Sequence, residues 1–272
     1  MKKISISMAK GGVGKTSTAV NLSAALAKSG KRVLLLDCDP QQGNATLFLG
    51  HNPNGLKVTV ANVINALLDL GVTDYIKEAM IRQSENLDLL PANPKLEAIQ
   101  NRLIAEKSNI GLLGEETEIQ PHEVVKTILA EVEDGYDYAI LDCPPSISML
   151  SINALVAADS VLLPVEAHYE CYEALVQTLD VIRKIKANWN PSLEIEGILL
   201  TKYQSRTRLC REIREYTQKN FASKIRVFDD TVPSSIRVAE LSGMGVSIFE
   251  HSPDSEAALA FEKLAEEVVK NA

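Results

Sequence analysis

Lys10-Gly11-Gly12-Val13-Gly14-Lys15-Thr16 is the stretch of this chain that decides its fold. Its glycines let successive backbone N–H groups turn toward one concavity, and such a concavity binds anions. In phosphate loops of this kind, the lysine at the position of Lys15 reaches the β- and γ-phosphates, and the hydroxyl at that of Thr16 holds Mg²⁺. The strict motif has glycine where this chain has Ala9, and a second lysine, Lys10, stands at the front of the loop. The sequence therefore predicts a nucleotide phosphate site with more positive charge than one triphosphate needs.

The flanks of the loop support this prediction. Residues 4–8 alternate as a short strand does, and residues 17–28 form an Ala/Leu-rich helical pattern that Gly30 ends. A strand, a glycine-rich loop and a helix in this order place phosphates at the positive end of the helix dipole.

Composition indicates a soluble cytoplasmic protein with an ample core. Of the 272 residues, 46% are hydrophobic and 24% are charged, and the net charge is −8. We find no apolar run of the roughly 20 residues that a membrane-spanning helix needs, and no metal-ligand spacing among the four cysteines. We expect one domain over residues 1–272.

Short apolar runs alternate with helical patterns along the whole chain, which favours a mostly parallel, twisted α/β sheet of about seven to eight strands with helices on both faces. The expected strands are 4–8, 33–37, 87–90, 138–142, 160–164, 195–201 and 225–228. The expected helices are 17–28, 59–70, 121–133, 149–157, 170–187, 207–220 and 254–270.

Carboxylates follow two of these strands, at the sheet edge where α/β proteins bind phosphates. Asp142 ends an apolar strand and is placed to hold a water molecule of Mg²⁺. Asp37 and Asp39 follow another strand two residues apart. One of them could orient the attacking water, and the residues alone do not choose between them.

The segment 202–226 is basic within an acidic chain, with eight lysines and arginines against two glutamates. In the helix expected there, Leu209, Ile213 and Tyr216 would share the inner face. Arg208, Arg211 and Arg214 would then lie on the outer face, as a site for a polyanion or as a merely solvated surface.

These motifs together resemble the ParA/Soj partition ATPases, of the deviant P-loop group that includes MinD and the nitrogenase iron protein. The resemblance covers nearly the whole chain, and the motifs that carry it are residues 10–16, 37–41, 43–46, 138–146, 152–155, 163–165, 199–201 and 231–233. It implies a homodimer that sandwiches two ATP molecules, binds DNA without sequence preference and is released when a ParB-like partner stimulates slow hydrolysis. It also implies a cytoplasmic protein that joins the nucleoid when ATP is bound.

The resemblance implies a role for each site residue. Lys10, Lys15 and Asp39 would be catalytic, Lys10 by crossing to the partner's phosphates and Asp39 by positioning water. Thr16 and Asp142 (through water) would serve Mg²⁺. The nucleotide would be bound by Lys10, Gly11, Gly12, Val13, Gly14, Lys15, Thr16, Ser17, Pro233 and Ser235.

DNA would contact five arginines: Arg206, Arg208, Arg211, Arg214 and Arg237. Two of them, Arg206 and Arg237, match family positions. The chain departs from the family at Ser234 and Ser235, at Val246, and by an extra glutamine in residues 39–43. Because of these departures, the DNA surface could be the helix at 206–226 or the loop at 233–246.

A MinD-like ATPase that positions cargo on a membrane or a protein array is the alternative. Because the last helix is acidic, with only Lys263 and Lys270 opposing four glutamates, we do not expect it to bind anionic lipid.

Overall fold

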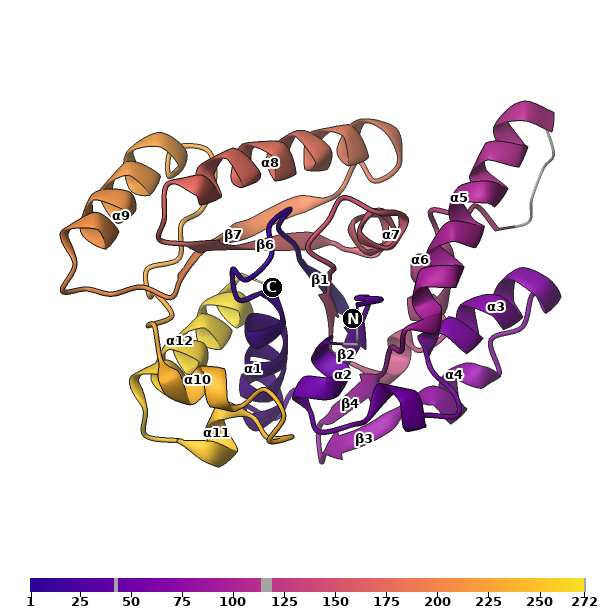
Figure 1. The fold of residues 1–272 in the computed structure, drawn as a ribbon, viewed down its shortest axis with the longest axis horizontal. Coiled ribbons are helices and arrows are strands. Elements are labelled where there is room, and N and C mark those ends of the chain that lie inside the picture. Colours follow the sequence, from indigo (N-terminus) through magenta and orange to yellow (C-terminus); the bar gives the residue numbers. More distant parts are fainter. Residues whose placement is uncertain (42–43, 114–118, 272) are drawn as a thin grey trace.

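A single seven-stranded sheet organises the computed structural model, which describes residues 1–41, 44–113 and 119–271 (Figure 1). Its strand order is β3-β4-β2-β5-β1-β6-β7, and only β3 runs antiparallel to its neighbour. The strands are β1 (Lys2–Ile6), β2 (Val33–Asp37), β3 (Ile81–Ser84), β4 (Leu87–Leu90), β5 (Tyr138–Asp142), β6 (Ser160–Glu166) and β7 (Glu194–Thr201).

Helices cover both faces of this sheet (Figure 1). They are α1 (Lys15–Lys28), α2 (Asn44–Phe48), α3 (Val60–Leu70), α4 (Tyr75–Ala79), α5 (Lys95–Leu113), α6 (Val124–Ala130), α7 (Met149–Ala157), α8 (Glu170–Asn188), α9 (Arg208–Phe221), α10 (Ile236–Glu240), α11 (Ile248–His251) and α12 (Glu256–Lys270). Two short 3₁₀ turns lie at Pro53–Gly55 and Glu133–Gly135.

The central strands are apolar on both sides because each side meets a helix layer. Along β2, Leu35 packs in the core under α1 and α12, whereas Leu34 and Leu36 pack under α3, α6 and α7. All five residues of β2 and of β5 are buried. The predicted α/β class and doubly covered parallel sheet are thereby confirmed.

Two local predictions need correction, and one long helix was not predicted. The strand expected at 225–228 is wrong: only Val227 bridges to Ile198 of β7, because the chain turns away at Asp229 and Asp230. The helix expected at 121–133 is shorter in the structure, where α6 spans Val124–Ala130. The sequence analysis also missed α5, whose 19 residues have too little apolar periodicity to be recognised.

None of the helices in the described part of the chain has both the length and the hydropathy needed to cross a bilayer.

Candidate active site

The phosphate loop follows β1 and leads directly into α1. Gly12 and Gly14 have φ angles of 76° and 85°, in the left-handed region that glycine adopts without steric cost. Gly14 also precedes the first residue of α1, so the free N–H groups of that helix point at the loop. The loop can therefore receive an anion.

Lys15 lies under the loop rather than in solvent. Its side chain is buried, and its Nζ donates a hydrogen bond to the Lys10 carbonyl at 2.8 Å. Burial lowers the pKa of Lys15, although the Asp142 and Asp39 carboxylates oppose this shift. An incoming phosphate would supply the negative charge that the buried ammonium group favours.

Lys10 points out of the loop and is paired within its own chain. Its Nζ lies 3.2 Å from Oε2 of Glu170, the first residue of α8. Slight burial acts to lower the pKa of Lys10, but the interaction with Glu170 outweighs it, so the pKa rises on balance. The contact is open to solvent, because the Glu170 side chain is 75% exposed.

Asp142 ends β5 beside the ends of β1 and β2, where it is in register with Ile6 and Asp37. It is fully buried, and neither of its carboxylate oxygens accepts a hydrogen bond of standard geometry from the described residues. Burial, followed by repulsion from Asp37, raises the pKa of Asp142, while the Thr16 hydroxyl opposes the rise. A buried carboxylate beside a threonine hydroxyl, with oxygens that accept no hydrogen bond of standard geometry, fits a site for Mg²⁺ and its water.

The structure gives Asp37 and Asp39 different surroundings. Asp37 accepts hydrogen bonds from the backbone N–H and the hydroxyl of Thr46 at 2.9 and 2.7 Å, and from the Asp39 N–H at 3.0 Å. Burial raises the pKa of Asp37 to about 6. Asp39, which is also buried, lies in the loop beyond β2 and accepts the Gln41 N–H at 2.8 Å. Asp37 thus holds the loop through its hydrogen bonds, while Asp39 lies close enough to Lys15 to affect its pKa. Gln42 and Gly43 are outside the described residues.

Two threonines that the sequence analysis missed hold the phosphate loop. The Thr201 hydroxyl at the end of β7 donates to the Val13 carbonyl at 2.8 Å. The Thr178 hydroxyl of α8 accepts the Ala9 N–H at 3.0 Å. Thr201 lies in the motif at 199–201, but both threonines are more than 150 residues away from the loop in the chain, so no local pattern indicated these contacts.

A cavity of about 320 Å³ adjoins the loop. Four residues expected at the nucleotide line it together: Gly14, Ser17, Pro233 and Ser235. Lys202, which was not expected there, also lines it with an unusual φ of 49°. A non-glycine residue in this region marks a backbone constrained by its surroundings. The cavity therefore opens directly beside the phosphate loop, between α1 and the segment that contains Pro233 and Ser235.

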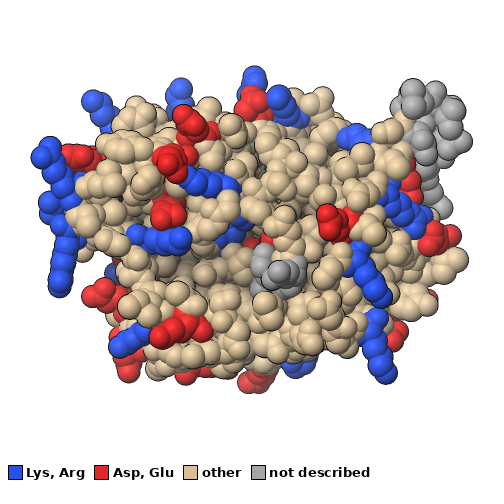
Figure 2. Space-filling view, viewed as in Figure 1, with Lys and Arg blue, Asp and Glu red and all other residues tan. Residues whose placement is uncertain are grey.

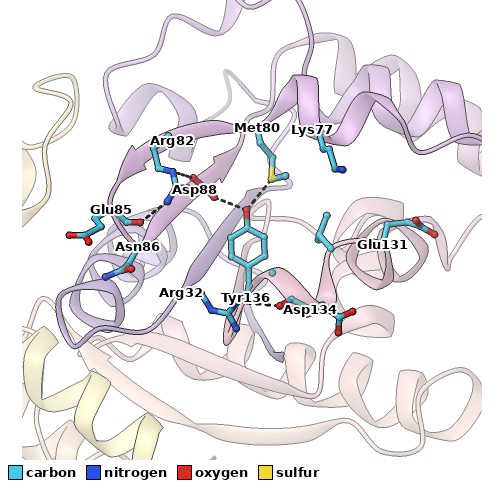
Figure 3. A pocket seen from close by; sticks show the side chains of 12 residues that line it. Arg32, Lys77, Met80, Arg82, Glu85, Asn86, Asp88, Glu131, Asp134 and Tyr136 are labelled. Atoms are coloured by element: carbon cyan, nitrogen blue, oxygen red, sulfur yellow. Dashed lines mark hydrogen bonds and ion pairs between the residues drawn. The ribbon is translucent and has the colours of Figure 1, made fainter.

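A larger pocket, of about 550 Å³, lies at the opposite edge of the sheet, where β2, β4 and β5 begin (Figure 3). Its floor carries Tyr136, whose hydroxyl donates to Asp88 at 2.7 Å. Asp88 also pairs with Arg82, and Arg32 pairs with Asp137. Because these two guanidinium groups are already paired and Glu85, Glu131 and Asp134 add negative charge, this pocket is unsuited to a triphosphate.

The five arginines expected at DNA differ in how they are engaged. Arg208 pairs with Glu212, and Arg214 donates to the Asp229 carbonyl at 3.0 Å. Arg206, Arg211 and Arg237 are exposed and make no ion pair within the described ranges. Figure 2 shows basic side chains projecting from the edge of the molecule that α9 forms.

The inner face of α9 also differs from the expectation. Cys210, Ile213 and Thr217 are buried, whereas Leu209 and Tyr216 are 37% and 49% exposed. Residues 210, 213 and 217 lie on one face of the helix, and this face packs toward Tyr172 of α8. Leu209 and Tyr216 therefore lie beside the arginines on the surface.

The fold and the site define a P-loop nucleotide-binding protein of the variant type with a second lysine in its loop. Residues 1–195 match the family described as an AAA domain. The sporulation initiation inhibitor protein Soj of Bacillus subtilis is 40% identical over 99% of this chain and 99% of its own length. The chromosome-partitioning ATPase Soj of Thermus thermophilus is 37% identical over 99% of this chain and 96% of its own. The chain therefore belongs to the AAA domain family and, within it, to the ParA/Soj partition ATPases.

A solved structure extends the similarity to a ligand-bound protein. The cobyrinic acid a,c-diamide synthase of Mycobacterium smegmatis, crystallised with ADP and magnesium, superposes with a TM-score of 0.81 at 29% identity. The match covers 100% of this chain and 95% of that one. The fold therefore extends to a protein whose name describes a different reaction, so function has to be argued from the site.

Proposed function

We propose that this chain is a DNA partition ATPase whose ATP-bound homodimer binds DNA without sequence preference. In this proposal a ParB-like activator stimulates a slow hydrolysis of ATP to ADP and phosphate, which releases the protein from DNA. The protein would then move between the cytoplasm and the nucleoid. The relative named as a chromosome-partitioning ATPase and the variant phosphate loop support this assignment.

ATP would bind with its phosphates in the loop and its nucleoside in the cavity beside Pro233 and Ser235. Mg²⁺ would be held by the Thr16 hydroxyl and, through water, by Asp142, where it would neutralise charge on the β- and γ-phosphates. Lys15 would stabilise the negative charge that develops on the transferred phosphoryl group, and Asp39 would orient the attacking water. Lys10 would leave Glu170 to reach the phosphates of the partner subunit, which links ATP to dimerisation.

The observation that carries the DNA assignment is a junction of two connectors. Tyr203, after β7, bridges to Pro233, and its N–H donates to the Val232 carbonyl at 3.0 Å. The same two connectors lead to Arg206 and Arg237 within a few residues. Nucleotide in the cavity and DNA on these arginines would thus both contact the segment after β7 and the segment around Pro233, which are hydrogen-bonded to each other.

A double charge reversal, Arg206→Glu with Arg211→Glu, tests this surface. Random-sequence duplex DNA should bind at least tenfold more weakly, because each lost phosphate contact removes counterion release. ATP-dependent dimerisation, followed by light scattering, should stay unchanged. The control Arg183→Glu with Lys184→Glu reverses two exposed charges near the end of α8. Equal binding by the test and control variants would show that the α9 surface is only solvated.

The structure gives no support to a membrane-binding alternative through the last helix. The apolar face of α12, which includes Phe261, Leu264 and Val268, is buried in the core that α1 also lines. This face is therefore unavailable to lipid in the folded chain.

A further inference from the structure

The first turn of α8 contacts both the phosphate loop and the basic helix α9. Glu170 makes the contact with Lys10 of the loop, and Tyr172 makes the contact with α9. Cys171, between them, is buried. Figure 1 shows α9 lying beside one end of α8, on the flank of the molecule away from α3 and α5.

On the nucleotide side, α8 holds the front of the phosphate loop at two points. Glu170 pairs with the Lys10 ammonium at 3.2 Å, and two turns later Thr178 accepts the Ala9 N–H at 3.0 Å. Thr178 is fixed in turn, because its hydroxyl donates to the Ala174 carbonyl at 2.7 Å. The buried contact at Thr178 is a fixed point, whereas the exposed ion pair at Glu170 is weak and a phosphate can displace it.

On the other side, Tyr172 joins α8 to α9. Its hydroxyl hydrogen-bonds to the Ile213 carbonyl at 3.1 Å and to the Thr217 hydroxyl. Its ring meets Tyr216 edge-on at 4.8 Å between centroids and stacks with Phe221 at 6.3 Å. A tyrosine held by both its hydroxyl and its ring transmits a displacement of its own helix to the neighbouring helix.

We infer that the first turn of α8 couples the phosphate loop to α9, with Glu170 sensing whether Lys10 is engaged by nucleotide and Tyr172 moving α9 in response. The inference rests on the proposed function, since it assumes that nucleotide phosphates draw Lys10 away from Glu170. It assigns Tyr172 as a positioning residue for the DNA surface, since it lies behind α9 and would not itself contact DNA.

Hydrogen exchange of the full-length protein measures this coupling without DNA. Amides of residues 208–221 are followed by mass spectrometry with no nucleotide and with ATPγS and Mg²⁺. In the unmodified protein, nucleotide should change exchange in both the phosphate loop and α9. In Tyr172→Phe the loop response should persist, while the α9 response falls about fivefold, because one buried hydrogen-bonding hydroxyl is lost.

Tyr216→Phe is the matched control, because it removes a hydroxyl on the exposed side of the same aromatic pair. It should respond as the unmodified protein does. Thr217→Val removes the partner hydroxyl from α9 and should reproduce the effect of Tyr172→Phe. A full α9 response in both Tyr172→Phe and Thr217→Val would overturn the role of Tyr172.

Glu170→Gln tests the other end of the coupling. It releases Lys10 without nucleotide, so α9 exchange in the nucleotide-free protein should shift toward the nucleotide-bound value. Glu173→Gln, an exposed neighbour on the same helix, should leave it unchanged. If Glu170→Gln exchanges as the unmodified protein does, Glu170 is not the sensor.

DNA binding measured on the same samples separates the two claims. An α9 response to nucleotide without any DNA binding would refute the proposed function and leave the coupling standing. ATP-dependent DNA binding with no α9 response in the unmodified protein would refute the coupling and leave the function standing.

Discussion

Three carboxylates and one buried lysine lie close together at the scale of single residues. Asp37, Asp39 and Asp142 meet at one edge of the sheet with Lys15. Burial raises the pKa of both Asp37 and Asp142, and repulsion between the neighbouring carboxylates adds to the rise. A magnesium nucleotide would supply a cation for these carboxylates and phosphates for Lys15.

Asp37 and Asp39 should respond differently to replacement by alanine. Asp37→Ala leaves three hydrogen-bond donors without their acceptor, so the free energy of unfolding in urea should fall by about 2 kcal/mol or more. Asp39→Ala should dimerise with ATP and keep most of its stability, yet lose hydrolysis measured by phosphate release. Full hydrolysis by Asp39→Ala would move the water-orienting role to another residue.

Contacts between loops and helix ends matter at the scale of elements. Gly50, after α2, and Gly245, before α11, meet backbone to backbone. A Cβ added at Gly50 would lie 2.8 Å from the Gly245 Cα. This contact fixes α2, and with it Thr46 and Asp37, against the segment that leads from the nucleoside cavity.

Gly50→Ala should therefore destabilise the protein, because both the clash and the φ of 81° oppose a side chain. Gly71→Ala is the control, since Gly71 has a φ of 66° but no atom within 4 Å of the added Cβ. The free energy of unfolding of Gly50→Ala should lie about 2 kcal/mol below that of Gly71→Ala. Equal values from urea titrations would mean that the two loops separate without cost.

A second element contact predicts a pH dependence. The ring of His122, before α6, packs at a tilt of 35° against Trp189, with 4.9 Å between ring centroids, and Lys107 of α5 lies 4.0 Å from the centre of the same indole. Burial lowers the pKa of His122. The positive charges of Lys107 and Lys126 lower it further, and the Glu123 carboxylate opposes the shift.

The unfolded chain therefore takes up a proton at His122 at a higher pH than the folded chain does. The free energy of unfolding should fall as the pH drops from about 6.5 through the lowered pKa, and the fall should be modest because the ring is only partly buried. Fluorescence of Trp189, the single tryptophan, reports unfolding in urea at each pH. His122→Gln should flatten this dependence, whereas replacing the exposed His168 by glutamine should not; equal slopes would contradict the assignment.

The sequence predicted the parts of this molecule that local chemistry specifies. Residues 10–16 and Asp142 were placed correctly at the sheet edge, because glycine spacing and apolar strands are local signals. Thr178, Thr201 and Tyr172 could not be found in this way, since their partners lie far away in the chain. Ile213 lies on the buried face of α9 as expected, whereas Cys210 and Thr217 are buried in place of Leu209 and Tyr216, because the contacts with Tyr172 lie far away in the chain.

At the scale of the whole molecule, the phosphate loop and the basic helix α9 both contact α8. The phosphate loop, β7, α8 and α9 are contiguous, while α3, α5 and the pocket around Tyr136 lie in the other half of the molecule (Figure 1). Although the net charge is −8, basic side chains project from the edge of the molecule that α9 forms (Figure 2). An acidic protein with one basic surface can bind DNA transiently and release it when that surface is rearranged.

Binding of the unmodified protein to random-sequence duplex DNA tests the central claim most directly. It is measured by fluorescence anisotropy with ATP and Mg²⁺, with ADP and Mg²⁺, and without nucleotide, each at two salt concentrations. We expect binding with ATP that weakens steeply as salt increases, and little binding in the other two states. ATP-dependent dimers that bind no DNA at either salt concentration would contradict the claim.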